Sequence, residues 1–85
     1  MSIRRVEAIP VSYKEPNDFN SVRHLCLVRI EDSSGHVGWG EAVTMWEEAT
    51  IATANIITGM KSLILDLDAV KNNEIIDKLI DHVWW

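Results

Sequence analysis

The chain has 85 residues, of which 47% are hydrophobic and 25% charged, and its formal net charge at pH 7 is -5. This length suits one small globular domain. The acidic balance and the scattered basic residues exclude the usual nucleic-acid-binding surface, because a phosphate backbone is bound by clustered Lys and Arg side chains.

Features that report on the cellular compartment are few. Cys26 is the only cysteine, so the chain can form neither an intrachain disulfide nor a cysteine metal cluster. The sequence shows no charged-then-apolar signal at its N-terminus and no apolar run of the roughly 18 residues that a membrane span needs. We therefore expect a cytoplasmic protein without a membrane partner. Natural domains usually finish in polar residues, so the terminal Trp84 and Trp85 suggest a truncated domain.

The first predicted strand covers residues 2–13, which are rich in Ile, Val and Tyr. Pro10 lies within it and cannot donate to a strand ladder. The segment is therefore either an edge strand or a strand with an irregularity at Pro10. The polar residues 14–21, with Pro16 among them, predict a loop.

The second and third strands are predicted over residues 22–31 and 36–43. The turn residues 32–35, Asp-Ser-Ser-Gly, join them into an antiparallel hairpin, with Gly35 free to take a positive φ. Alternation places the more apolar set of side chains of the second strand toward the core. That set is His24, Cys26, Val28 and Ile30.

Two helices are predicted over about 47–64 and 71–84. Thr44 followed by Glu47 is a possible capping box at the start of the first helix. Its predicted apolar stripe is Ala49, Ala52, Ile56, Met60, Leu63 and Ile64, and that of the second is Ile76, Leu79, Ile80 and Val83. Strands followed by helices indicate an α+β fold, a three-stranded antiparallel meander with the helices packed on one face of the sheet.

One face of the third predicted strand carries only small residues. Gly38, Gly40 and Ala42 share one face, which permits the close approach of a helix or another backbone. Phosphate binding would need the glycines at a strand-to-helix junction, so a packing role is favoured. Glu41 near the end of the strand is interpreted as a structural anchor that binds a backbone N–H or a nearby arginine.

No catalytic or metal-binding constellation emerges from spacing alone. The three histidines are dispersed, and His24 is interpreted as a core residue. Asp66 and Asp68 lack the glycine and the distal glutamate of a calcium loop. We therefore assign no catalytic residue and no metal ligand to this chain.

The order of motifs nevertheless resembles a known family. The strand "VEAIPV", the strand "LCLVRIEDSSG", the segment "HVGWGEA" and the helix start "EEAT" resemble the beginning of the enolase superfamily, in its mandelate racemase and muconate lactonizing enzyme branch. The resemblance covers about residues 3–64. It weakens between the helices, where family members often carry Gly and Asp-Pro and this chain has "LDLDAV".

This resemblance implies that the chain is a partial N-terminal capping domain. The catalytic (β/α) barrel, which is absent from this chain, would hold Mg²⁺ and the acid/base residues. The full-length parent would be an isomerase or lyase that abstracts a proton α to a carboxylate, acting as a racemase, epimerase, cycloisomerase or dehydratase. The implied partners are the barrel, a small carboxylate substrate and further copies in a homo-oligomer, while the fragment alone is predicted to be inactive.

In that family two loops of the capping domain close over the mouth of the barrel, and they map to residues 14–22 and 43–47. The implied lid residues are Asn17, Asp18, Phe19, Asn20, Thr44, Met45 and Trp46. Packing of Trp46 on its own helix start is the alternative for that residue. The alternative for the whole chain is a free-standing small interaction or dimerisation module, suggested by its four tryptophans.

Overall fold

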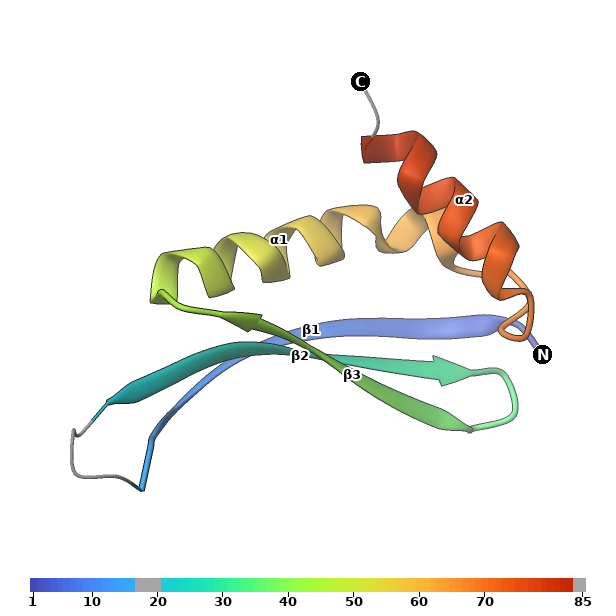
Figure 1. The fold of residues 1–85 in the computed structure, drawn as a ribbon. Helices are drawn as coiled ribbons and strands as arrows, with labels where there is room; N and C mark the ends of the chain where they lie inside the picture. The colour runs from blue at the N-terminus through green and yellow to red at the C-terminus, as the bar shows by residue number, and fades with distance from the viewer. Residues whose placement is uncertain (17–20, 84–85) are drawn as a thin grey trace.

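The computed structural model describes residues 1–16 and 21–83 of the protein (Figure 1). Strands β1 (Ile3–Lys14), β2 (Val22–Asp32) and β3 (Val37–Thr44) form one antiparallel sheet in the order β1-β2-β3. Helices α1 (Glu47–Ile64) and α2 (Asn72–Val83) follow. The predicted α+β class and the three-stranded meander are confirmed, and each bound lies within one residue of its predicted range.

Both helices lie on the same side of the sheet, which leaves the opposite face without a helix from the described residues (Figure 1). The helix α1 packs chiefly against β1. Cys26 of β2 is fully buried, and Val28 and Ile30 pack against the core, so the predicted inward face of β2 is confirmed for these three residues. The open face carries the other set of β2 side chains, with Leu25 and Leu27 among them.

The irregularity of β1 lies near its start. The register shifts between Ile3 and Arg5, whereas Pro10 pairs in regular register with Cys26. This bulge adds one residue to the strand and therefore lets Ile3 and Val6 both face the helices. The first strand is thus an edge strand, the first of the two predicted alternatives, and Pro10 does not break its register.

The core is small and lies toward the N-terminal end of β1. Ile3, Val6 and Ile64 form its buried centre, and the half-buried Ile57 and Leu79 pack around it. These contacts join β1, α1 and α2, so the core depends on residues from the two ends of the chain.

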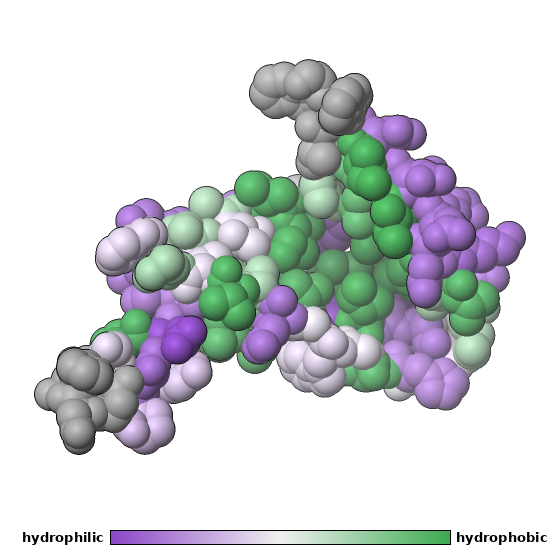
Figure 2. Space-filling view, in the orientation of Figure 1, coloured by the Kyte–Doolittle hydropathy of each residue, from purple (hydrophilic) through white to green (hydrophobic). Residues whose placement is uncertain are grey.

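The helical phase agrees with the prediction only in part, since Leu63, Ile64 and Leu79 of the predicted stripes lie at the core. In α1 the buried residues are Thr50, Ala54 and Ile64, whereas Ala52 and Ile56 of the predicted stripe are exposed. In α2 Ile75 and Leu79 pack on the core, and Ile76 and Ile80 are half exposed. Both helices carry more apolar residues than their contacts cover, so periodicity alone did not fix the buried face. Figure 2 shows the apolar side of α2 toward α1 and its polar side outward.

The connector between the helices holds the N-terminal residues through its backbone. Ile3 N–H donates to Leu67 O at 2.7 Å, and Asp66 N–H donates to Ile3 O at 2.8 Å. Ala69 N–H donates to Met1 O at 2.8 Å. Asp66 has a positive φ of 71°, the left-handed conformation that often ends a helix. An aspartate thus occupies the type of position that glycine usually takes.

The turn between β2 and β3 is closed by Asp32. Its Oδ1 accepts hydrogen bonds from the backbone N–H of Ser34 at 2.8 Å and of His36 at 3.0 Å. Partial burial opposes ionisation of Asp32, but these backbone donors and the nearby His36 ring outweigh it and lower its pKa. Gly35 has a φ of 87°, so its predicted positive φ is confirmed.

Two expectations for β3 are wrong. A Cβ atom built on Gly38 or Gly40 would meet no atom within 4 Å, so no described segment packs closely on either glycine. The Glu41 side chain is exposed on the open face, and its carboxylate has no hydrogen-bond or ion-pair partner among the described residues. It is therefore not an anchor there. For the glycines the physical reason is that α1 packs chiefly on β1 and leaves much of β3 uncovered. Glu41 lies on the face opposite the helices, so no helix offers it an N–H group.

Candidate functional site

The sheet brings the two predicted lid loops to one end of the molecule. Lys14 at the end of β1 pairs with Val22 at the start of β2, and His24 pairs with Thr44 at the end of β3. Because neighbouring strands lie about 5 Å apart, the segments 14–22 and 43–47 emerge side by side.

The predicted lid residues of the second loop are accessible. Met45 is 78% exposed and Trp46 is 63% exposed, so most of each residue is open to solvent. Thr44 is half-buried and ends β3. The predicted residues of the first loop, Asn17, Asp18, Phe19 and Asn20, lie outside the described residues.

A chain of hydroxyl groups fixes the second loop on α1. Thr44 Oγ1 donates to His24 O at 3.3 Å and is hydrogen-bonded to Thr50 Oγ1. Thr50 Oγ1 also lies 3.1 Å from Trp46 O. The N-cap of α1 is Trp46, which makes no side-chain cap hydrogen bond. The capping box predicted at Thr44 and Glu47 is therefore wrong, because Thr44 still belongs to the strand.

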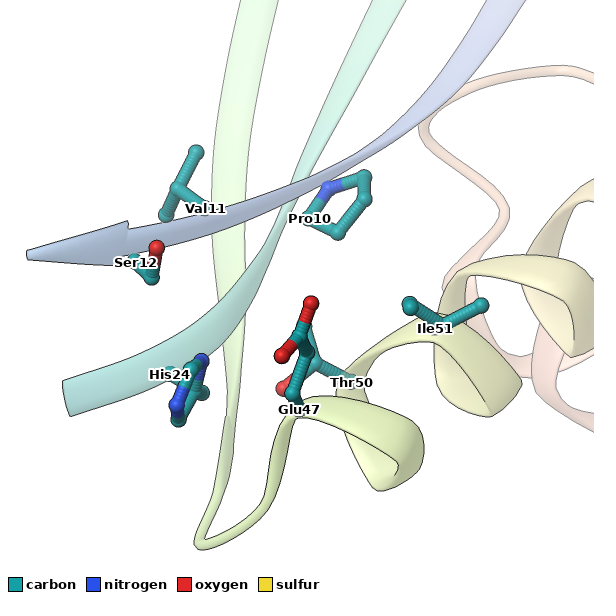
Figure 3. Close-up of a pocket in the computed structure, with 7 residues that line it drawn as sticks. All are labelled: Pro10, Val11, Ser12, His24, Glu47, Thr50 and Ile51. Atoms are coloured by element: carbon teal, nitrogen blue, oxygen red, sulfur yellow. The ribbon is translucent and has the colours of Figure 1, made fainter. Parts of the chain in front are cut away.

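A hollow lies between the start of α1 and the strands beneath it (Figure 3). Glu47 points its carboxylate into this hollow from the first turn of α1, and the ring of His24 stands at the side on β2. The residues that line it are Pro10, Val11, Ser12, His24, Glu47, Thr50 and Ile51. It combines an acid, an imidazole and two hydroxyl groups with an apolar wall.

A second hollow lies between the two loops. It is lined by Glu15, Ser21, Val22, Arg23, His24, Val43, Thr44 and Met45. Arg23 Nε donates to Glu15 Oε1 at 2.7 Å, and this hydrogen bond raises the pKa of the guanidinium. Glu15 N–H donates to Ser21 O at 2.8 Å and closes the base of the first loop. This end of the sheet can therefore hold the base of the first loop in one shape.

Sequence reasoning missed the part that His24 and Glu47 play in this geometry. His24 was interpreted as a core residue, yet it is half-buried and lines both hollows. The signal that could have found it is the hairpin register, which follows from the turn at residues 32–35 and places His24 opposite Thr44. The position of Glu47 over the strands depends on the path of the loop and could not be read from spacing.

Within residues 1–16 and 21–83 no three His, Cys, Asp or Glu side chains gather closely enough to hold a metal ion. The donors at this end of the sheet, Glu47 and His24, have no third ligand beside them in that part of the chain. Within residues 1–16 and 21–83 this end of the sheet therefore lacks the set of oxygen ligands that a Mg²⁺ site needs.

Three comparisons with known proteins found no protein similar to this chain. Neither models of known families, nor curated proteins, nor solved structures returned a match to this chain. Among the helices of the described ranges, neither α1 nor α2 has the length and apolar character needed to cross a bilayer.

Proposed function

We propose that this chain is the N-terminal capping part of an enolase-superfamily enzyme of the mandelate racemase and muconate lactonizing branch. Its two loops, 14–22 and 43–47, would close over the mouth of a (β/α) barrel that carries the chemistry. The observation that carries the proposal is that the strand ends from which these loops start lie together at one end of a β-β-β-α arrangement, with Met45 and Trp46 exposed there.

The role of the loops in this proposal is to exclude water and to select the substrate. Large apolar side chains such as Met45 and Trp46 bury substrate surface on closure, and a dry site strengthens the electrostatic interactions within it. The hydroxyl chain from Thr44 to Thr50 would keep the second loop in position. Proton abstraction α to a carboxylate, with Mg²⁺ as electrophile, would belong to the barrel of a cytoplasmic parent, and racemisation, epimerisation, cycloisomerisation and dehydration share that step.

The test starts from the reading frame beyond residue 85. The longer product is purified with Mg²⁺, and exchange of the α-proton is followed by NMR in D₂O for a panel of small carboxylates. Met45→Ala and Trp46→Ala should each raise KM roughly tenfold, which corresponds to about 1.4 kcal/mol of lost substrate contact. The matched control is Ile56→Ala, an exposed apolar residue of α1 away from both loops.

Two results would contradict the proposal. One is a reading frame that lacks barrel-like βα repeats after the helices, which would favour the free-standing interaction module. The other is proton exchange by the chain of 85 residues alone, because the proposed chemistry belongs to the barrel.

A further inference from the structure

The two edges of the sheet are protected very differently. The outer edge of β1 carries Pro10, the bulge at Arg4 and the terminal Lys14, all of which hinder pairing with another strand. The strand β3 contains no proline and no lysine, and its register with β2 runs without a shift from Thr44 to Val37. The edge of β3 is therefore the one that can accept a further strand.

The outward backbone groups of β3 follow from the hairpin turn. Asp32 N–H donates to His36 O at 3.0 Å, and Gly35 N–H donates to Asp32 O at 3.1 Å, so Asp32 forms a hydrogen-bonded pair with the turn. Hydrogen-bonded and non-hydrogen-bonded pairs alternate along an antiparallel ladder. Alternate residues of β3 therefore direct their N–H and C=O groups away from β2. They are Val37, Trp39, Glu41 and Val43.

The space beside this edge is open. On the helix side of the sheet no described atom lies within 4 Å of the Cβ positions of Gly38 and Gly40. On the opposite face Trp39 is 62% exposed and Val43 is 63% exposed. No strand of the described chain lies beyond β3, so its outward donors and acceptors have no strand partner there.

We propose that the outer edge of β3 pairs antiparallel with the same strand of a second copy, about a two-fold axis at Gly40. In this register Trp39 of each copy lies opposite Glu41 of the other, and Val37 lies opposite Val43. All four outward-facing residues of each strand are then used, which gives about eight backbone hydrogen bonds. The product is a continuous six-stranded sheet, a common sheet size.

Repulsion between the Glu41 carboxylates and the limited length of β3 favour this register over the two neighbouring registers. An axis at Glu41 would place the two carboxylates directly opposite each other, and like charges in that position destabilise a strand pair. An axis at Trp39 would place Val43 opposite Gly35, which belongs to the turn rather than to the strand. The axis at Gly40 avoids both problems, so β3 is complementary to itself, which is why a second copy is the expected occupant.

The experiment measures association of the protein expressed from its full reading frame by sedimentation equilibrium over a concentration series. Trp39→Lys and Trp39→Glu remove the same ring and differ mainly in charge. Lys at this position faces Glu41 of the other copy, whereas Glu repels it, so Trp39→Glu should dimerise roughly tenfold more weakly than Trp39→Lys. Tyr13→Lys and Tyr13→Glu, on the exposed far edge of the same face, control for net charge and should not differ in this way.

A second pair of variants tests the backbone. Glu41→Pro removes one outward N–H group, whereas Glu41→Ala keeps it, so only the proline variant should lose the dimer. Circular dichroism establishes that each variant is folded, and if Glu41→Pro is not, the Trp39 pair decides alone. A protein that stays monomeric throughout the series, or equal dimer affinity for Trp39→Lys and Trp39→Glu, overturns the proposal. Neither result bears on the capping function, which is measured by substrate turnover.

Discussion

The two ends of the sheet are built in different ways. At the hairpin end, Ile3 is 2% exposed, and its backbone N–H and C=O groups both form hydrogen bonds with the connector between the helices. At the loop end, Met45 and Trp46 are largely exposed, and two hollows open between the strands, the loops and α1. The buried core centre and the bonds to the connector thus lie at the hairpin end, although Met1 and Val70 are exposed there too. In the described part of the chain, the loop end has no such buried apolar centre beside its exposed Met45 and Trp46.

Because of this difference, we expect the hairpin end to contribute more to stability and the loop end more to recognition. Segments with few buried apolar contacts open at low cost, and binding loops are drawn from such segments. The hairpin end then acts as the scaffold, and the loop end supplies exposed side chains that can contact a partner surface. Substitutions at the two ends should therefore affect unfolding unequally.

The largest effect is expected for Ile3→Ala at the hairpin end. This change removes a buried side chain from the core centre that Ile3 shares with Val6 and Ile64, and it should lower the free energy of unfolding by about 2–4 kcal/mol. Urea denaturation followed by circular dichroism measures it. The matched control at the loop end is Ile51→Ala, which is 48% exposed and should cost clearly less. Equal losses for the two variants would remove the distinction between the ends.

An intermediate effect is expected for Thr50→Val at the loop end. The change keeps the side-chain shape and removes the hydroxyl that is hydrogen-bonded to Thr44 and lies 3.1 Å from Trp46 O, at a cost of about 1 kcal/mol. The loss is limited because Thr44 still donates to His24 O and Thr50 N–H still donates to Trp46 O. Thermal unfolding of this variant is compared with that of Thr58→Val, an exposed helix residue. A Thr50 variant no less stable than the Thr58 variant would contradict the role of the hydroxyl chain.

The smallest effect is expected for Asp32, in the turn at the hairpin end. Its pKa is lowered in the folded state, so the unfolded chain binds more protons as the pH falls through that range. The stabilisation is complete above the unfolded pKa, near 4, and is lost at lower pH. Asp32→Asn should therefore be less stable than the wild type at pH 7 and nearly equal to it near pH 2. Urea titrations at the two pH values test this, and a difference that does not change with pH would show that the carboxylate charge is irrelevant.

Much of the fold could be predicted because its local signals agree. Alternation defined β2, the turn residues with Gly35 defined the hairpin, and a continuous apolar period defined α1 from Glu47 to Ile64. Each of these signals depends only on residues close together in the sequence, which is why it could be read without a structure.

What could not be predicted depends on how the elements pack. The buried face of α1 contains Thr50 and Ala54 rather than Ala52 and Ile56, because small residues and a bonded hydroxyl allow the helix to lie close to the sheet. The open space beside Gly38 results from the position of α1 over β1. The hollow that Glu47 and His24 share requires three separate segments, and no spacing in the sequence reports it.

The hydrogen bonds of Ile3 with Asp66 and Leu67 join the first strand to the connector after α1. They close the long loop from Ile3 to Leu67, and loop closure costs more conformational entropy as the loop grows. The hairpin of β2 and β3, by contrast, needs only neighbouring residues. The bonds of Ile3 to the connector need residues 66 and 67, whereas the pairing of β1 with β2 needs only residues up to Asp32.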